Sequence, residues 1–307
     1  MRNRIADMRR EMKLVVVLFI AHLVALLFAL AGVLIFMAHP ALISASPLIQ
    51  QSFPWGEKLG GMVYILLGAA TLLTFGAVTL GRRRTAIFFA VATLLPLTAE
   101  LIGTSTGWPF GHYAYTDLLG AKVLGRVPFT IPLSWFYMGF TAYLLASVIT
   151  GALRLRGRTF WSLALGAWLL VAWDLALDPA MARNAVFPFW TWYTHGVYFG
   201  MPIQNFVGWW LVGFIFMGVS RWLWRADAPT DLPAWLPLGM YLANMVFAMA
   251  LSLSAGLWPP LLIALALGIL PASLALRGAR GLRGSSGGLG AETDAEPASH
   301  VASAPTL

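Results

Sequence analysis

The chain alternates long apolar stretches with short polar connections. The apolar stretches cover residues 14–37, 59–80, 85–102, 132–153, 159–177, 205–223, 235–256 and 259–276. A helix of about 20 apolar residues crosses a hydrocarbon core about 30 Å thick, and each stretch comes close to that length. We therefore predict an all-α, polytopic transmembrane bundle of about eight spans. The last two spans are separated only by "GLWPP", in which Pro259 and Pro260 stop one helix and start the next.

The composition supports a membrane protein and excludes several kinds of chemistry. Of the 307 residues, 59% are hydrophobic and 10% are charged, whereas soluble domains carry about 25% charged residues. The chain has no cysteine, which excludes disulfides, thiolate nucleophiles, iron–sulfur clusters and Cys-ligated haem. The basic start "MRNRIADMRREMK" precedes an apolar stretch longer than the core of a signal peptide, so we predict an uncleaved first span.

Lysine and arginine are distributed unevenly between the connections. Alternate connections hold 16 of the 20 basic residues: Arg2, Arg4, Arg9, Arg10, Lys13, Arg82, Arg83, Arg84, Arg154, Arg156, Arg158, Arg221, Arg225, Arg277, Arg280 and Arg283. The other connections hold Lys58, Lys122, Arg126 and Arg183. Cytoplasmic loops are enriched in Lys and Arg, so we predict a multi-pass protein of the inner (cytoplasmic) membrane with both termini cytoplasmic. The same bias accounts for the net charge of +8 without a nucleic-acid partner.

A change of composition near residue 277 divides the chain. Residues 1–277 form the predicted membrane domain, in which we find no internal repeat. The segment 278–307 is rich in Gly, Ser, Ala and Pro. Such a segment cannot bury enough apolar surface to order itself, so we predict a disordered cytoplasmic tail.

Two connections on the face with few basic residues are longer than a turn requires. They are 103–131, "GTSTGWPFGHYAYTDLLGAKVLGRVPFTI", and 179–204, "PAMARNAVFPFWTWYTHGVYFGMPIQ". Glu100 precedes the first, and Asp174 and Asp178 precede the second. Long structured loops are often functional, so we predict that both converge beside the three carboxylates. Their candidate substrate contacts are Trp108, His112, Tyr113, Tyr115, Asp117, Trp190, Trp192, Tyr193, His195 and Tyr198.

The three carboxylates are unusual because an ionised carboxylate at mid-membrane costs roughly 2.5–3.5 kcal/mol. Asp178 before Pro179 also fits ordinary helix-terminus chemistry, and Asp117 fits a solvated loop as well as a site. Asp174 lies one turn deeper than Asp178, and the i,i+4 spacing puts both on one helix face. A functional site is the default hypothesis for acids placed in this way.

Two carboxyl groups in different surroundings can divide the work of acid and base. In an apolar, aromatic pocket a protonated carboxyl can protonate an alkene, and Trp and Tyr rings can stabilise the resulting carbocation. A second carboxylate can orient a water molecule and accept its proton. This scheme needs no metal, nucleotide or redox cofactor, and the sequence offers no clear motif for one.

Other chemistries have weaker support. The DxxxD spacing of Asp174 and Asp178 also occurs in the metal–diphosphate sites of membrane prenyltransferases, which normally have two Asp-rich motifs where this chain has one. His112 and His195 could join the carboxylates on a metal, but the five His residues form no HxxxH or HxxHH cluster. The loop aromatics also suit an interfacial belt. A transporter would show symmetric halves or paired broken helices, which we do not find.

Two long blocks carry a family resemblance: "AELIGTSTGWPFGHYAYTDLLGAKVLGRVPFTIPLSW" and "AWDLALDPAMA…FWTWYTHGVYFGMPIQNFVGWW". Over roughly residues 59–275 the chain resembles the integral-membrane carotenoid-biosynthesis family that includes the CruF-type carotenoid 1,2-hydratases. The resemblance implies addition of water across the terminal 1,2 double bond of an acyclic ψ-end, as in lycopene or γ-carotene, to give a tertiary alcohol. The family's motifs match Glu100, Trp173, Asp174, Asp178, Pro179, Gly200, Met201, Pro202 and Asn205 in this chain.

We therefore expect a cofactor-independent carotenoid hydratase. Asp174 is the expected acid because it lies deepest, Glu100 or Asp178 is expected to position water, and Trp173 and Asn205 join the expected substrate contacts. The expected partners are a carotenoid in the bilayer and other enzymes of carotenoid synthesis. Two alternatives stay open: a non-catalytic carotenoid-binding or assembly protein, and a Mg²⁺-dependent membrane prenyltransferase.

Overall fold

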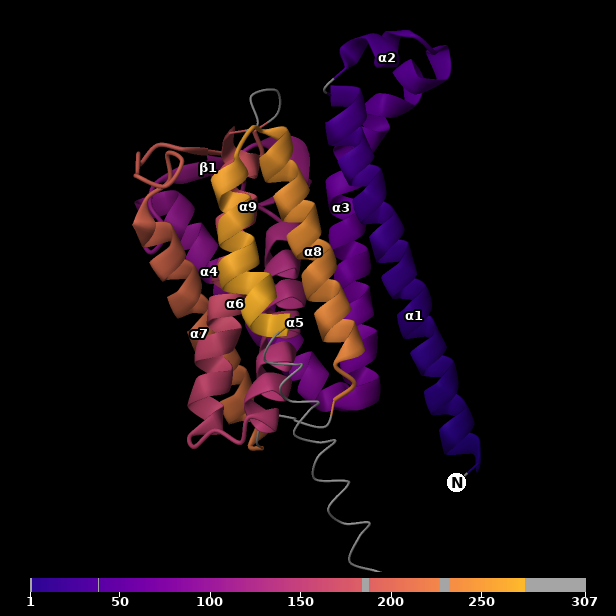
Figure 1. The fold of residues 1–307 in the computed structure, drawn as a ribbon, viewed down its shortest axis with the longest axis vertical. Helices are drawn as coiled ribbons and strands as arrows, with labels where there is room; N and C mark the ends of the chain where they lie inside the picture. The colour runs from indigo at the N-terminus through magenta and orange to yellow at the C-terminus, as the bar shows by residue number, and fades with distance from the viewer. Residues whose placement is uncertain (1, 38, 184–187, 227–231, 274–307) are drawn as a thin grey trace, which may run out of the picture.

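The computed structural model describes residues 2–37, 39–183, 188–226 and 232–273. In these residues long helices run side by side and short strands lie at one end (Figure 1). The helices are α1 (Arg2–Ala31), α2 (Pro40–Ser44), α3 (Pro47–Thr79), α4 (Arg82–Thr106), α5 (Thr130–Ala152), α6 (Arg158–Arg183), α7 (Ile203–Trp224), α8 (Trp235–Ser254) and α9 (Trp258–Ala264). Short π-helical segments follow α1 at Gly32–Met37 and α9 at Leu265–Ile269. The predicted all-α bundle is confirmed.

Seven helices in the described part of the chain are long and apolar enough to cross a membrane. The eighth predicted span, 259–276, corresponds to a shorter apolar helix over Trp258–Ser273. Pro259 and Pro260 lie in its first turn, where their missing N–H groups cost no helical hydrogen bond. The predicted tail at 278–307 lies outside the described residues.

Helix α3 is longer than the apolar pattern predicts. It begins at Pro47 rather than near residue 59, so most of the expected connection after the first span is helical. Pro47 occupies the first helical position, where its fixed φ angle favours helix initiation. As a result the far ends of α1 and α3, with α2 between them, project beyond the other helices (Figure 1).

Helix α5 is the centre of the bundle. Its side chains are buried along almost the whole length, and it packs against α3, α4, α6, α7 and α8. An aromatic cluster fixes these contacts: Phe88 of α4 stacks on Phe140 of α5 with ring centroids 4.4 Å apart, and Phe216 of α7 meets Phe88 edge-on at 5.9 Å. A helix that is apolar all round is typical of such an enclosed position.

A buried polar network ties α1 to this bundle. His22 of α1 is fully buried, and its Nδ1 lies 2.8 Å from the carbonyl oxygen of Tyr64 in α3. Asn244 of α8 lies with Nδ2 3.2 Å from His22 Nε2, and the Tyr137 hydroxyl of α5 donates to Asn244 Oδ1 at 2.9 Å. Because buried polar groups need partners, this network holds four helices in register.

The two long loops meet, as predicted. Strand β1 (Tyr113–Tyr115) of the first loop pairs antiparallel with β4 (Trp190–Trp192) of the second. Within the first loop, β2 (Lys122–Val123) pairs with β3 (Val127–Pro128). Both loops begin later than predicted, because α4 continues to Thr106 and α6 continues through Pro179 to Arg183.

The strands and the basic connections lie at opposite ends of the bundle. In Figure 1 the N-terminus and the connections between α3 and α4 and between α5 and α6 are at the lower end, and β1 and α2 are at the upper end. The lower connections carry the arginines at 82–84 and 154–158. The helices thus separate the two sets of connections as the charge pattern predicts, and the assignment of the lower end to the cytoplasm stays a prediction.

Close packing of α5 against α7 gives the first testable prediction. A Cβ at Gly139 would lie 2.4 Å from Phe216 Cζ, and Phe216 is fully buried, so its ring has little room to move. We expect Gly139→Ala to lower the free energy of unfolding by about 1–3 kcal/mol, as overpacking does. Thermal unfolding in detergent measures the change.

The control is Gly218→Ala in α7, where the nearest atom to the added Cβ would be Leu163 Cδ1 at 3.7 Å, an ordinary contact. Its unfolding temperature should equal or exceed that of the unmodified protein. Equal unfolding temperatures for both variants would contradict the packing described here.

Candidate active site

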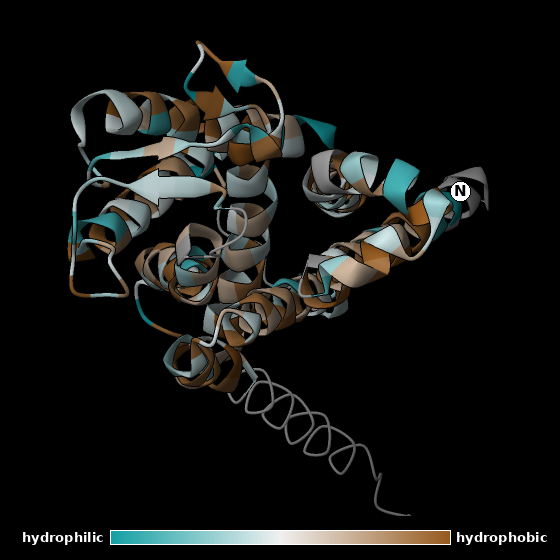
Figure 2. Cartoon of the chain, turned by 90° about the horizontal axis from the view of Figure 1, so that it is seen from above, coloured by the Kyte–Doolittle hydropathy of each residue, from teal (hydrophilic) through white to brown (hydrophobic). Residues whose placement is uncertain are grey.

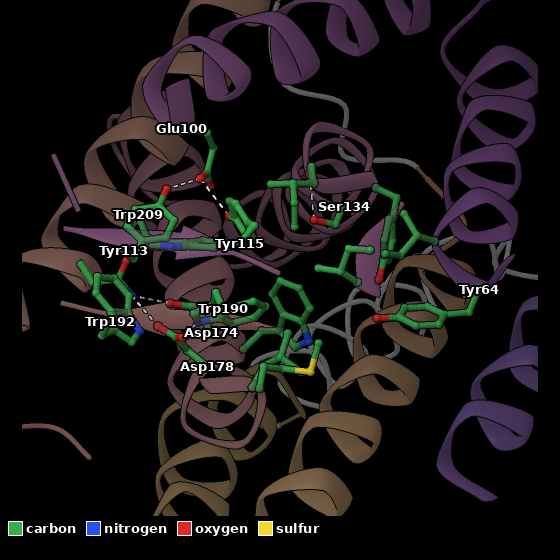
Figure 3. A pocket seen from close by; sticks show the side chains of 18 residues that line it. Tyr64, Glu100, Tyr113, Tyr115, Ser134, Asp174, Asp178, Trp190, Trp192 and Trp209 are labelled. Atoms are coloured by element: carbon green, nitrogen blue, oxygen red, sulfur yellow. Dashed lines mark hydrogen bonds between the residues drawn. The ribbon is translucent and has the colours of Figure 1, made fainter. Parts of the chain in front are cut away.

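A cavity beneath the β1–β4 pair contains all three predicted carboxylates (Figure 3). The empty volume of this cavity is about 630 Å³, which includes space open to the surroundings. Helices α3, α4, α5, α6 and α7 and the two long loops all contribute to its wall. The lining residues are Tyr64, Ile65, Glu100, Tyr113, Tyr115, Leu119, Ile131, Ser134, Tyr137, Trp173, Asp174, Leu177, Asp178, Met181, Trp190, Trp192, Asn205 and Trp209.

Glu100 of α4 is only 2% exposed and accepts three hydrogen bonds. The hydroxyl of Tyr113 donates to Oε2, the hydroxyl of Tyr115 donates to the same oxygen at 2.9 Å, and Trp135 Nε1 of α5 donates to Oε1 at 2.9 Å. Burying a carboxylate is costly unless it is hydrogen-bonded. These three donors replace the water that Glu100 loses on burial.

Asp174 and Asp178 of α6 are also 2% exposed, but their donors are divided unequally. Asn205 Nδ2 of α7 donates to Asp174 Oδ2 at 3.2 Å and to Asp178 Oδ2 at 2.8 Å. Asp178 receives a second hydrogen bond from Trp190 Nε1 at 2.5 Å. Asp174 therefore has one long, shared donor, whereas Asp178 has two.

The β1–β4 register explains how the loops supply these donors. Tyr113 lies opposite Trp192, and Tyr115 lies opposite Trp190. Since alternate residues of a strand share a face, all four aromatic side chains point to the cavity side. The paired rings are 5.0 Å and 6.0 Å apart between centroids, and such cross-strand pairs stabilise two short strands.

Both loop tyrosines keep their protons at neutral pH. Burial, followed by the nearby Glu100 carboxylate, raises the pKa of Tyr113 and of Tyr115 well above the ordinary value for tyrosine. Loss of either proton would place a second negative charge against Glu100. The two hydroxyls therefore act as permanent donors to the carboxylate.

Three neighbouring indoles form another part of the site. Trp209 of α7 stacks on Trp135 with ring centroids 3.9 Å apart, and Trp173 of α6 meets Trp209 edge-on at 6.2 Å. Trp173 Nε1 is buried and has no hydrogen-bond partner among the described residues. The cavity thus combines carboxylates with aromatic faces, which attract cations within about 6 Å of the ring.

Pro179 explains the role of one predicted contact. A proline inside a helix has no N–H, so the carbonyl four residues earlier loses its helical donor. Here that carbonyl belongs to Leu175, and the Tyr198 hydroxyl donates to it at 2.8 Å. Tyr198 thus completes the backbone of α6 and does not line the cavity.

Nine of the predicted side chains line the cavity: Glu100, Tyr113, Tyr115, Trp173, Asp174, Asp178, Trp190, Trp192 and Asn205. Six others do not: Trp108, His112, Asp117, Tyr193, His195 and Tyr198. Trp108 and Tyr193 are 65% and 64% exposed, and His112 and His195 are exposed as well. Residue type within a loop does not predict which way a side chain turns, so the loop sequence alone does not show which of its residues line the cavity.

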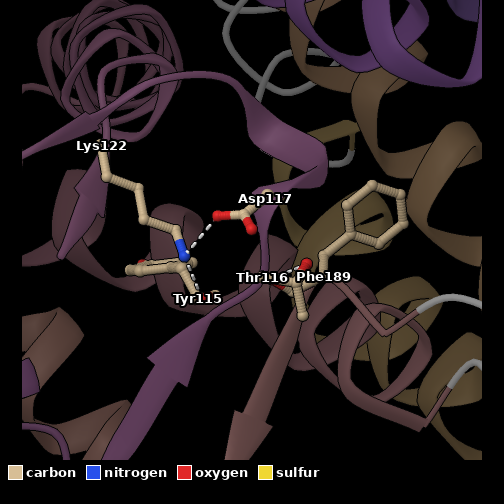
Figure 4. A network of polar contacts seen from close by, with 5 residues as sticks. All are labelled: Tyr115, Thr116, Asp117, Lys122 and Phe189. Carbon is tan, nitrogen blue, oxygen red and sulfur yellow. Dashed lines mark hydrogen bonds and ion pairs between the residues drawn. The ribbon is translucent and has the colours of Figure 1, made fainter. Parts of the chain in front are cut away.

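Asp117 has a structural partner on the outer surface. Lys122 Nζ lies 2.8 Å from Asp117 Oδ1 and donates to the Tyr115 carbonyl at 2.8 Å (Figure 4). Thr116, which lies between Tyr115 and Asp117 in the sequence, donates its backbone N–H to the Phe189 carbonyl of the second loop at 3.0 Å. This network holds Tyr115 over the cavity from outside.

Several further residues complete the site. Trp135 and Trp209 lie in the "PLSW" and "VGWW" ends of the two blocks that carry the family resemblance, and this position in the sequence indicates that they belong to the site. Tyr64 and Tyr137 lie within apolar spans, and Ser134, Leu119 and Met181 have no distinguishing pattern. Only the fold brings them to the cavity.

The same acids do not form a cluster suited to a metal ion. Among the described residues, no three His, Cys, Asp or Glu side chains gather in a way that could hold a metal ion. Asp174 and Asp178 instead face the N–H₂ group of Asn205.

Comparisons with known proteins agree with the resemblance seen in the sequence. The chain is 30% identical over 195 residues to the bisanhydrobacterioruberin hydratase of Haloarcula japonica, an alignment that covers 62% of this chain and 61% of that relative. No solved structure matches the chain significantly. The sequence pattern of the family described as "Carotenoid biosynthesis protein" matches residues 60–271. Since that range is more than half of the chain, the protein belongs to the carotenoid biosynthesis protein family.

Proposed function

We propose that the protein is a carotenoid hydratase that adds water across the terminal 1,2 double bond of an acyclic ψ-end, as in lycopene or γ-carotene. The observation that carries the proposal is the cavity with three buried carboxylates, unequally supplied with donors, beside stacked indoles. The family membership and the hydratase name of the Haloarcula japonica relative support the same activity.

Asp174 is the proposed acid. A carboxyl group with few donors is poorly stabilised as an anion, and Asp174 has only the long hydrogen bond that it shares with Asp178. It therefore holds a proton that it can give to the alkene. The proton adds to C2, the π electrons form the new C–H bond, and C1 becomes a tertiary cation.

The rest of the cavity stabilises that cation. Glu100 accepts three hydrogen bonds, which favour its ionised form. Its negative charge and the faces of Trp173 and Trp209 attract the developing positive charge. Charge stabilisation by groups already in place is commonly the largest contribution to catalysis.

Asp178 is the proposed base. Water attacks C1 through an oxygen lone pair and gives a proton to the Asp178 carboxylate, so that one molecule of water has been added to the double bond. Asp178 then returns the proton to Asp174. The two carboxyl groups are neighbours in the cavity, because both Oδ2 atoms lie within hydrogen-bond distance of Asn205 Nδ2.

The direct test of this activity is expression in a host that accumulates lycopene, followed by chromatography and mass spectrometry of the pigments. We expect products heavier by one water per ψ-end. In heavy water each hydrated end should keep one deuterium on carbon, because C–D bonds survive the work-up while the hydroxyl deuterium exchanges. Unchanged pigment from protein that is folded in the membrane would argue for the carotenoid-binding alternative, and release of diphosphate with a strict Mg²⁺ requirement would argue for the prenyltransferase.

Substitutions separate the proposed roles of the carboxylates. Asp174→Asn removes the proton donor and should lower turnover by about 10²- to 10⁴-fold, the usual contribution of general acid catalysis. Glu100→Gln keeps the size and shape of the side chain. The Gln oxygen can still accept the hydrogen bond from Trp135, while the Gln NH₂ group can donate to the tyrosine hydroxyl oxygens. We expect the Gln variant to fold like the unmodified protein and to lose turnover through its missing charge.

The matched control is Glu11→Gln, which neutralises an exposed carboxylate beside Arg82, at the end of the bundle opposite the cavity. Turnover should be unchanged in this variant. Full activity of correctly inserted Asp174→Asn would disprove the assigned acid.

We also propose that the strand-bearing end of the bundle faces away from the cytoplasm in the inner membrane. The chain has no cysteine, so single cysteines can report sidedness. Val197→Cys in the second loop, at an 87% exposed position, should react with a membrane-impermeant thiol reagent in spheroplasts. Arg156→Cys, exposed between α5 and α6, should react only after lysis, and the reverse pattern would invert the proposed topology.

A further inference from the structure

A second and larger cavity lies beside the carboxylate site. The empty volume of this second cavity is about 1870 Å³, which includes space open to the surroundings. Helices α1 and α3, the end of α6 and helix α8 contribute to its walls. All of the lining residues among those described are uncharged, and aromatic side chains such as Phe28, Phe53, Trp55 and Phe247 are prominent. Seen from above, the N-terminal helix runs out to one side of the bundle (Figure 2), and the cavity lies where α1 and α3 adjoin the remaining helices.

The two cavities adjoin each other. Tyr64, Leu119 and Met181 line both of them, and all three side chains are at least 94% buried. Figure 3 shows Tyr64 at the end of the carboxylate site far from Glu100, Asp174 and Asp178. The large cavity therefore adjoins the end of the small one that Tyr64 lines, so the pair consists of one acidic end and one long apolar arm.

Glycines keep the apolar arm open. Gly56 and Gly60 lie on the same face of α3 at i,i+4 spacing, and a Cβ at Gly60 or at Gly32 would meet no atom within 4 Å. Glycine inside a helix costs about 1 kcal/mol relative to alanine. Glycine at these positions therefore lowers the stability of the helix, and it leaves space in the cavity that a side chain would occupy.

We propose that this arm binds the polyene chain of the substrate while the terminal double bond lies among the carboxylates. The inference rests on the proposed function and extends it to the rest of the substrate molecule. A carotenoid is a long hydrocarbon of which only one end reacts, and the smaller cavity cannot contain the whole chain. An uncharged, aromatic cavity that adjoins the reacting end matches that chemistry, since burial of apolar surface stabilises the complex.

Much of the arm is built by residues outside the family match at 60–271. Its outer wall is formed by alanines and phenylalanines of α1 and the π-helical segment that follows it, between Ala25 and Phe36, and by the first turns of α3, from Ile49 to Leu59. The carboxylates all lie within the matched range. In this proposal α1 and the start of α3 bind the polyene tail, and the helices within the family match carry the reacting groups.

The test fills the arm without touching the carboxylates. Gly60→Phe and Ala29→Phe place a ring in the cavity from α3 and from α1, and Val246→Phe places the same ring on a 55% exposed position of α8 that does not line it. Each variant in lipid nanodiscs is titrated with lycopene, with tryptophan fluorescence quenching as the binding signal. Hydration is then followed with lycopene and with myrcene, a short terpene that ends in the same trisubstituted double bond.

Both filling variants should weaken lycopene binding by about tenfold or more, equivalent to about 1.4 kcal/mol, and slow lycopene hydration. Their hydration of myrcene should stay at the level of the unmodified protein, because that substrate needs no arm. Val246→Phe should resemble the unmodified protein throughout, and Asp174→Asn should bind lycopene normally.

Unaltered lycopene binding in folded Gly60→Phe and Ala29→Phe would overturn the assignment. Loss of a co-purifying phospholipid from these variants, with lycopene binding intact, would overturn it too and make the arm a lipid site. If the unmodified protein binds lycopene through the arm but hydrates neither substrate, the proposed hydratase activity fails while the binding site stands.

Discussion

A carboxylate buried among membrane helices must be given hydrogen-bond donors, and much of this structure follows from that requirement. Glu100 takes its donors from strand β1 and from the central helix α5, and Asp178 takes one from strand β4. The strands can only reach these acids if the two long loops fold down onto the bundle and pair with each other. Three acids on two helices thereby specify the position of both loops.

Unequal sharing of donors gives these acids different chemical properties within one cavity. Glu100 has three donors, Asp178 has two and Asp174 has part of one. Asn205 is the link, since one amide nitrogen contacts both aspartates and holds them as a pair. The proposed mechanism needs separate groups as acid, base and counter-charge, and a site of equivalent carboxylates would not distinguish them.

The bundle also has two regions of different packing: a tightly packed centre around α5 and an open apolar cavity beside it. Around α5, aromatic rings interlock so closely that even a methyl group at Gly139 has no room. Between α1, α3 and α8 the same chain leaves a wide cavity bordered by glycine, alanine and single aromatic rings. The His22–Asn244–Tyr137 network spans the boundary and keeps α1 attached while the space beside it stays open.

Apolar periodicity by itself determined the class of fold, because a run of about 20 apolar residues has one stable arrangement in a bilayer. Intramembrane acids indicated the location of the candidate site for a similar reason: Glu100, Asp174 and Asp178 are costly to bury, and such acids are by default a hypothesis for a functional site. Loop side chains were different. Tyr113 and Tyr115 face the cavity whereas His112 and Tyr193 face outward, and only strand pairing decides between them.

Residues with ordinary sequence surroundings were also invisible until the helices were in place. Tyr64 sits in an unremarkable apolar span, yet it lies where the two cavities meet. Trp135 reaches Glu100 across 35 positions of sequence, and Asn205 reaches Asp178 across 27. Such contacts depend on how helices far apart in the chain pack side by side, and a linear pattern carries information only about its own helix.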